Sequence, residues 1–148
     1  MQKFILIASP IVSVVSLALT YYLFRQTQRA NVMPVLVFAR ISTNRWQLAN
    51  VGHGPAVSIV VGDKASDGKW GYKVRCFPIA AGAQVSLDWL QHGDELVATY
   101  TDTRGNTYSS VCSNNENRFD QSNRFPDLVP SVDEYTLRAM REDYRRSF

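Results

Sequence analysis

Histidines and their acidic neighbours are the residues of this chain best suited to catalysis. His53 lies between two glycines and His92 precedes Gly93, so both fall in segments typical of turns. A catalytic base must lie within hydrogen-bonding reach of the group that it activates, and a nucleophile needs such a base beside it. Asp94 follows His92 closely, but this spacing requires no such arrangement. The sequence therefore predicts no catalytic residue, no cofactor and no small-molecule substrate.

Cysteines are the other chemically versatile residues, and the chain has two, Cys76 and Cys112. Together with two distant histidines they lack the short ligand spacing of a zinc site, and Asp63 with Asp67 does not match a calcium loop. We predict no metal site. On facing strands of a two-sheet fold the cysteines would form a disulfide in an oxidising compartment, whereas in the cytoplasm they would be buried thiols. The sequence leaves both alternatives open.

The net charge of +3 and the pI near 9.0 are mildly basic. Arginines gather after the first 24 residues and again at the C-terminus, which suits anionic lipid head groups or an acidic protein surface. A nucleic-acid-binding protein would need aromatic and basic residues interleaved on a recognisable module. No such module is visible, so we expect protein and lipid partners and no nucleic acid.

An uncharged run from Phe4 to Phe24 dominates the N-terminus. A helix of about 21 residues is long enough to cross a hydrocarbon core about 30 Å thick. A cleaved signal peptide is the alternative, but its apolar stretch is shorter and ends in small residues, whereas Tyr21 and Tyr22 suit a membrane interface. We predict a single-pass anchor over residues 1–25 and a linker over 26–33.

The charges that flank this run suggest its orientation. Lys3 precedes it and Arg25 and Arg29 follow it, while no acidic residue appears before Asp63. Basic residues favour the cytoplasmic side of a span. The prediction is a bacterial inner-membrane protein with its N-terminus outside and its soluble domain in the cytoplasm rather than the periplasm.

Short alternating segments with turn residues between them fill residues 34–113. They predict seven strands, and strands at this spacing are typical of a small antiparallel, immunoglobulin-like β-sandwich. The expected strands are 35–40, 46–51, 57–61, 72–77, 84–90, 95–100 and 107–112. The aromatic residues expected in the core are Phe38, Trp46, Phe77, Trp89 and Tyr100.

One turn between these strands combines an amide, two glycines and a proline: Asn50, Gly52, Gly54 and Pro55. Asparagine bonds nearby backbone groups, glycine accepts unusual φ angles and proline fixes the entry of the next strand. We interpret this turn as structural.

The C-terminal extension, residues 114–148, begins with a polar loop or extended tail over 114–123. Pro126 and Pro130 predict extended backbone over 125–130, and the extension is predicted to end in a helix over about 131–146. Ser131 and Glu134 have the spacing of a capping box, and apolar residues then recur at helical intervals. This face would pack on its own domain, or bind a partner or the membrane surface. Its candidate binding residues are Leu137, Met140, Arg141, Tyr144, Arg145 and Phe148.

The Asn-x-Gly-x-Gly-Pro-Ala turn at residues 50–56 and the later Tyr100, Asp102 and Gly105 resemble a pattern found in uncharacterised bacterial membrane-anchored proteins. The resemblance covers roughly residues 5–112. It implies a mainly β fold, with an N-terminal transmembrane helix before an immunoglobulin-like sandwich, and no particular activity.

Two main functional hypotheses follow. The first is a non-catalytic accessory subunit that stabilises or bridges a larger membrane protein complex for energy transduction, transport or secretion. Its span would pack against integral membrane subunits along a face of small residues: Ser9, Ser13, Ser16 and Thr20. The alternative is a membrane-tethered sensor domain that binds a ligand or peptide. In a third reading, the C-terminal helix lies on anionic lipid.

Overall fold

The structure is a computed structural model of the 148-residue chain. It describes residues 2–30, 32–43, 45–90, 95–137 and 139, with the side chains of residues 2–11 and 28–30 left out of the description. The chain divides into two compact units, Met1–Val32 and Met33–Phe148. We call the second unit the β domain.

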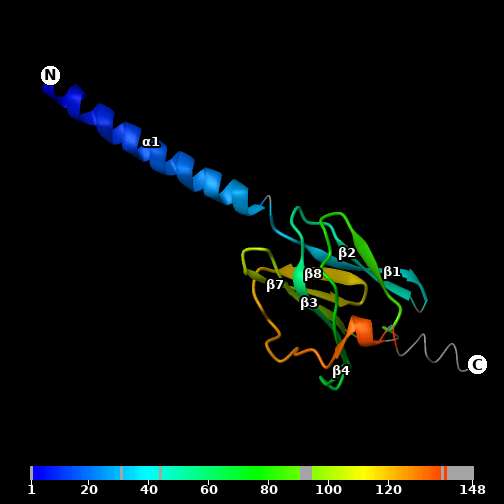
Figure 1. Ribbon diagram of the computed structural model, residues 1–148. Helices are drawn as coiled ribbons and strands as arrows, with labels where there is room; N and C mark the ends of the chain where they lie inside the picture. The colour runs from blue at the N-terminus through cyan, green and yellow to red at the C-terminus, as the bar shows by residue number, and fades with distance from the viewer. Residues whose placement is uncertain (1, 31, 44, 91–94, 138, 140–148) are drawn as a thin grey trace, which may run out of the picture. The chain divides into compact units, whose positions relative to one another are not determined.

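The first unit is the helix α1, Gln2–Ala30 (Figure 1). It contains the whole run from Phe4 to Phe24, for which a helix was predicted. Among the residues that the structure describes, no helix combines the length and the apolar character needed to cross a membrane. The membrane-spanning part of the prediction is therefore not confirmed, and the first third of the run lies outside the described side chains.

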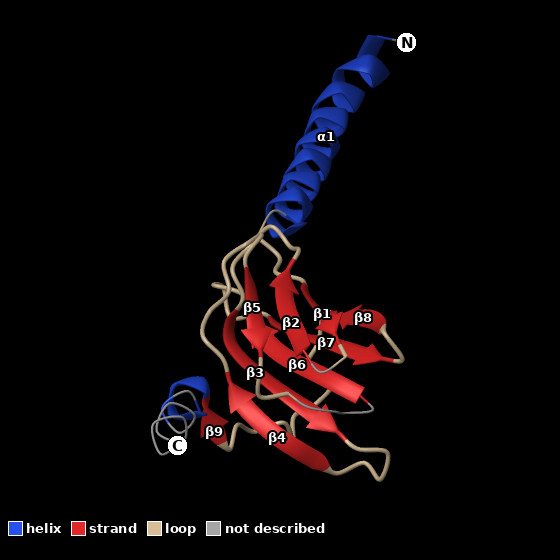
Figure 2. Ribbon diagram, turned by 90° about the vertical axis from the view of Figure 1, so that its right-hand side faces the viewer, coloured by secondary structure: helices blue, strands red, loops and turns tan. Residues whose placement is uncertain are grey.

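The β domain contains two sheets (Figure 2). The three-stranded sheet has the order β1-β2-β5, and the six-stranded sheet the order β8-β7-β6-β3-β4-β9. Every pairing is antiparallel except that between β4 and β9, which is parallel. The strands are β1 Leu36–Ser42, β2 Arg45–Asn50, β3 Val57–Lys64, β4 Trp70–Arg75, β5 Gln84–Leu87, β6 Glu95–Thr101, β7 Thr107–Ser113, β8 Glu116–Asp120 and β9 Val132–Asp133.

The mainly β prediction is confirmed, because each of the seven expected strands has a counterpart among β1 to β7. The immunoglobulin-like assignment is not confirmed. The polar loop expected after residue 113 is wrong, since β8 pairs with β7 there. Asn114 and Asn115 both adopt positive φ, 53° and 65°. A two-residue hairpin loop favours a turn in which both central residues have positive φ, because the twist of that turn matches the twist of the strands. Asparagine tolerates positive φ better than most residues do.

Both sheets contribute to one hydrophobic core. Leu36, Leu48 and Leu87 of the smaller sheet cluster with residues of the larger sheet such as Ile59 and Leu96. Among the expected core aromatic residues, Phe38 and Tyr100 are buried, whereas Trp46 and Trp89 are half-buried. Phe77 was wrongly placed in the core. It is 50% exposed, because β4 ends at Arg75 and the chain then leaves the sheet.

The segment 125–137, which we call the C-terminal strap, forms a second, smaller core. Leu128 is buried with Val60 and Val97, and Phe125 meets Trp70 edge to face at 5.9 Å. The Trp70 indole also donates a 2.6 Å hydrogen bond to Asp127. Leu128 and Trp70 would be the nearest neighbours of a Cβ added at Gly62, so a glycine lets the strap approach β3 closely. These contacts hold the strap beside the sheet.

Candidate binding groove at the edge of β4

The outer edge of β4 is where the strap meets the sheet (Figure 2). The amide of Ser131 donates a 2.9 Å hydrogen bond to the Lys73 carbonyl, and Val132 then pairs with Val74 in β9. An open strand edge exposes unpaired backbone groups that invite association with another chain. The strap therefore satisfies part of the edge of β4 within the molecule.

This arrangement corrects the predicted start of the C-terminal helix. Ser131 does not cap a helix, because its hydroxyl donates to the Lys73 carbonyl at 3.1 Å and residues 132–133 are a strand. Helical backbone begins only at Glu134. The Glu134 carboxylate does not complete a capping box either, since it accepts a 3.3 Å hydrogen bond from the Phe77 amide. Pairing with β4 outweighs the local helix signal here, as tertiary contacts commonly do.

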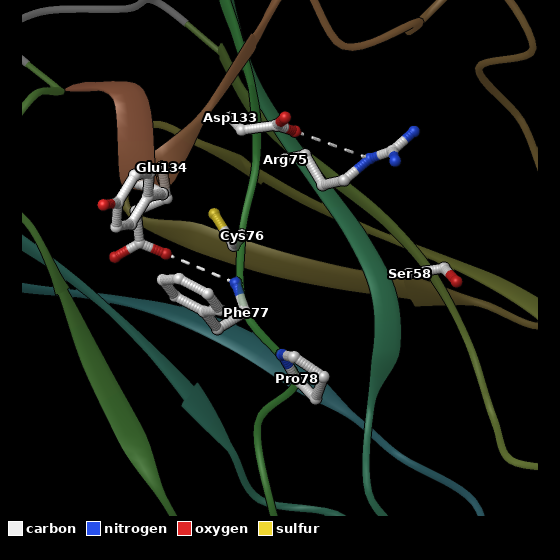
Figure 3. A pocket seen from close by; sticks show the side chains of 8 residues that line it. Ser58, Arg75, Cys76, Phe77, Pro78, Asp133 and Glu134 are labelled. Carbon is white, nitrogen blue, oxygen red and sulfur yellow. Dashed lines mark hydrogen bonds and ion pairs between the residues drawn. The ribbon is translucent and has the colours of Figure 1, made fainter. Parts of the chain in front are cut away.

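A groove lies between the strap and the residues that follow β4 (Figure 3). Its volume is about 380 Å³, near the lower end of the range for small-molecule sites. We call it the β4-edge groove. It is lined by Ser58, Arg75, Cys76, Phe77, Pro78, Asp133, Glu134 and Tyr135.

Aromatic side chains form the accessible part of this groove. Tyr135 is 73% exposed and Phe77 is 50% exposed, while Pro78 beside them is also exposed. Large rigid side chains of this kind dominate the energetics of protein interfaces, because they bury much apolar surface and lose little conformational entropy. The groove therefore presents the residue types that bind a partner's apolar side chain.

Charged groups of both signs surround these aromatic residues. Arg75 and Asp133 form a surface ion pair at 3.9 Å, and more than half of each side chain is exposed. Such a pair contributes little to stability, so both groups can reorient toward a partner. Glu134 is only 4% exposed and is held by the Phe77 amide. Formally the three groups sum to −1, which favours a partner segment with a basic or hydrogen-bond-donating group beside its apolar one.

Ser58 is brought to the groove by an irregularity in β3. Its φ of 51° lies in the left-handed region, and the register between β3 and β6 shifts between Val57 and Val60. Such a bulge bends a strand and changes the direction of a side chain. Nothing in the residue types around Ser58 signals this bulge.

The predicted binding face of the C-terminal helix is only partly described. Leu137 packs against the main core of its own domain, which for this residue is the first of the two predicted alternatives. The other predicted residues lie outside the described part of the chain: Met140, Arg141, Tyr144, Arg145 and Phe148.

The predicted structural turn holds the start of β1. Asn50 is 1% exposed, and its side-chain oxygen Oδ1 accepts hydrogen bonds from the amides of Val35, at 3.2 Å, and Gly52, at 3.1 Å. Its side-chain nitrogen donates to the carbonyls of Gly54, at 2.8 Å, and Ile79, at 3.1 Å. Asn50 thus joins three segments that are distant in sequence.

Glycine is required at position 52 of this turn. A Cβ there would lie 2.4 Å from both the Met33 carbonyl oxygen and the Val35 amide nitrogen, closer than real Cβ contacts. Gly54, which is buried, donates its amide to the Met33 carbonyl, and Pro55 is exposed just before β3. The turn therefore packs directly on Met33–Val35, the first residues of the β domain.

A buried carboxylate closes the hairpin between β6 and β7. Asp102 is 2% exposed and accepts hydrogen bonds from Asn106, Arg104 and Tyr108 at 2.7–3.0 Å. Burial raises the pKa of Asp102, but hydrogen bonds from Asn106, Tyr108 and Arg104 outweigh it and hold this pKa below its ordinary value. Gly105 has the positive φ, 83°, that the turn needs. These contacts give Asp102 a structural role.

The small residues predicted to form a helix-packing face lie on α1. The described side chains of Ser13, Ser16 and Thr20 are exposed, whereas that of Ser9 lies outside the description. Thr20 donates its hydroxyl to the Ser16 carbonyl at 2.8 Å. This is the local i−4 bond that a helical threonine commonly makes, and it leaves the predicted packing role untested.

The two cysteines are not in a disulfide. Both lie on the six-stranded sheet or at its margin, Cys76 just after β4 and Cys112 in β7. Strands β3 and β6 separate β4 from β7, which corresponds to about 14 Å at the usual strand spacing. A disulfide needs Cα atoms within about 7 Å. The facing-strand alternative is therefore wrong, and burial raises the pKa of the Cys112 thiol.

Sequence reasoning did not find the β4-edge groove. Its residues come from three separate segments, which the pairings of β4 with β3 and with β9 bring together. The prolines at 126 and 130 predict extended backbone over 125–130, but no local signal shows that Val132 pairs with β4. Comparison with known proteins gives no family model, no curated protein and no solved structure that matches this chain.

Proposed function

We propose that this protein is a non-catalytic, membrane-anchored accessory subunit that stabilises or bridges components of a larger bacterial membrane protein complex. In this proposal α1 crosses the inner membrane, the β domain is an immunoglobulin-like sandwich on the cytoplasmic side, and the β4-edge groove receives a segment of a neighbouring subunit. The resemblance to bacterial membrane-anchored proteins belongs to the same proposal.

The exposed aromatic groove is the observation that carries the proposal. Phe77 and Tyr135 present apolar surface beside Arg75 and Asp133, as binding surfaces with a desolvated centre and a polar rim do. The uncharged run from Phe4 to Phe24 supports the anchor, since its length matches a hydrocarbon core of about 30 Å.

The first test purifies the tagged full-length protein in mild detergent and identifies co-purifying proteins by mass spectrometry. A photo-crosslinking amino acid replaces Tyr135, and in a control it replaces Ile41, which is 53% exposed but does not line the groove. We expect a defined set of membrane proteins in stoichiometric yield, with crosslinks from position 135 several-fold more abundant than from position 41. Equal crosslinking from both positions would contradict the role of the groove.

A second test addresses the packing face of the helix. Replacing Ser13 and Ser16 by leucine removes the small residues that allow another helix to approach closely, so recovery of partners should fall. Val14→Leu is the matched control, because it changes size at an exposed neighbour outside the series of small residues. Unchanged recovery with the double variant would count against lateral packing.

The groove also favours the second hypothesis, a membrane-tethered domain that binds a peptide or small ligand. Its volume of about 380 Å³ is enough for one or two side chains of an extended peptide. Recovery of the chain alone would support this alternative, and peptide arrays probed with the full-length protein would then identify the preferred sequence.

A further inference from the structure

The two ends of the β domain differ sharply in charge. We define the tether end as the end at which the chain enters the domain. It comprises residues 33–35, 50–55, 80–83, 102–106 and 121–123. Hydrogen bonds join four of these segments: His53 N to the Met33 carbonyl at 3.0 Å, Gly82 N to the Asn50 carbonyl at 2.9 Å, and the Gln121 amide to the Met33 sulfur at 3.3 Å. The pairing of Thr101 with Val57 places residues 102–106 at the same end.

The tether end contains almost no exposed charge. Among its residues, all of them described, Asp102 is the only carboxylate and is buried within its own hairpin, while Arg104 is the only lysine or arginine. Val51 stands out with 60% of its surface exposed, and alanine and glycine residues at 80–82 are exposed beside the turn. This surface offers small and apolar groups and one cation, and at its margin the partly exposed Asp120 carboxylate is paired with Arg124 at 3.8 Å.

The opposite end has the reverse character. It contains the β1–β2 hairpin, the β3–β4 turn, the start of β6 and the β7–β8 hairpin. The charged residues that the structure describes there include Arg45, Lys64, Asp67, Lys69, Asp88, Glu95 and Glu116. Ion pairs such as Arg45 with Asp88, at 3.7 Å, occur there, and their side chains are half or more exposed to water. The opposite end is therefore suited to exposure to water.

Connectivity places the tether end near the end of α1 in the sequence. Only residues 31 and 32 lie between Ala30 and Met33. If the hydrocarbon core ends at Phe24, the six helical residues that follow rise about 9 Å. The head-group layer on each side of a bilayer is roughly 5–8 Å thick. The chain would thus enter the β domain at the outer face of the head groups.

A membrane surface favours contact with a protein surface that has few exposed carboxylates and some exposed basic and apolar side chains. The cytoplasmic leaflet is anionic, so exposed carboxylates are repelled from it, while a lysine or arginine near the surface is attracted to it. Apolar side chains at the tip of a turn can enter the boundary between head groups and acyl chains. The tether end meets both conditions, whereas the opposite end fails the first.

We propose that the tether end is a membrane-contact surface, with Val51 and Arg104 in the head-group layer of the bilayer that holds α1. The partner is the lipid surface itself. This inference rests on the proposed membrane anchor.

Spin labels on the full-length protein test it. Single cysteines replace Val51, Arg104 or, as a control at the opposite end, Ala65, and each carries a nitroxide. The native Cys76 and Cys112 are 5% and 3% exposed, so they compete little for the label. The proteins are reconstituted into vesicles of phosphatidylcholine and phosphatidylglycerol. Collision with a water-soluble nickel complex is then compared with collision with oxygen, which concentrates in lipid.

We expect nickel accessibility to be several-fold lower at positions 51 and 104 than at 65, although all three side chains are exposed in the structure. Equal accessibility at the three positions, in protein that alkaline carbonate does not extract from the vesicles, would overturn the contact surface and leave the anchor intact. Extraction by carbonate would overturn the anchor, and the contact surface with it.

Discussion

Asn50 is the residue whose replacement tests the architecture of the β domain most directly. In Asn50→Ala, the amides of Val35 and Gly52 lose their acceptor, and the carbonyls of Gly54 and Ile79 lose a donor. The Ile79 carbonyl still accepts from Ala56, so the largest penalty falls on the buried Gly54 carbonyl. A buried group without a partner costs about 1–3 kcal/mol, and each further lost bond about 0.5–1.5 kcal/mol. We expect the free energy of unfolding to fall by about 3 kcal/mol.

Urea unfolding followed by tryptophan fluorescence measures this change. All three tryptophans, Trp46, Trp70 and Trp89, lie in the β domain, so the signal reports on that unit in the detergent-solubilised full-length protein. With a urea dependence of about 2 kcal/mol per M, the midpoint should move down by about 1.5 M.

Two further variants isolate the cause. Asn123→Ala removes one exposed hydrogen bond, to the Phe125 amide at 3.1 Å, and should change stability by no more than about 0.5 kcal/mol. Asn50→Asp keeps shape and both acceptor bonds but places a carboxylate against the Gly54 and Ile79 carbonyls. The destabilisation caused by Asn50→Asp should lessen as the pH falls, because the protonated carboxyl group can donate a hydrogen bond to one of these carbonyls. If Asn50→Ala and Asn123→Ala shift the midpoint equally, the bridging role is refuted.

Three other predictions concern single features of the β domain. Because hydrogen bonds hold the pKa of Asp102 below its ordinary value of 3.8, its ionised form stabilises the fold above about pH 4, and this contribution is lost as the pH falls through the folded pKa. Urea titrations from pH 2 to 7 should therefore show a shallower acid slope for Asp102→Asn, and an unchanged slope would contradict this. Alkylation in urea without reductant should add two adducts to the intact mass, one each at Cys76 and Cys112, whereas an unmodified pair would indicate a disulfide. Leu128→Ala should cost about 2–3 kcal/mol and speed proteolysis within the strap, since Leu128 anchors the smaller core; an unchanged cleavage rate would show that the strap is held elsewhere.

Local pattern was sufficient for most of the strands. Alternating residues such as those of Gln84–Leu87 must place one side in a core, and glycines such as Gly105 mark where the chain turns. These signals lie within a few residues of each other, so the sequence alone predicted β1 to β7. Strand β8 has a polar sequence, and its only local signal was the Asn114–Asn115 pair that forms the turn before it.

The candidate site depended on contacts that are distant in sequence. Ser131 and Glu134 read locally as a helix cap, yet the unpaired edge of β4 accepts Ser131 and Val132 as a strand, and Glu134 binds the Phe77 amide. Leu128 packs against the sheet and holds the strap there, although no alternation or helical spacing in the sequence identifies it as a buried residue.

The sequence by itself determined the N-terminal helix, the run of seven strands and the structural character of the Asn50 turn, because these follow from nearest-neighbour backbone preferences and side-chain alternation. Only the tertiary structure decided that Phe77 is exposed, that Cys76 and Cys112 are too far apart to pair, and that a groove forms beside β4. Each of these features depends on which strands pair with each other. The free energy of the whole fold decides that pairing, and the preference of no single segment does.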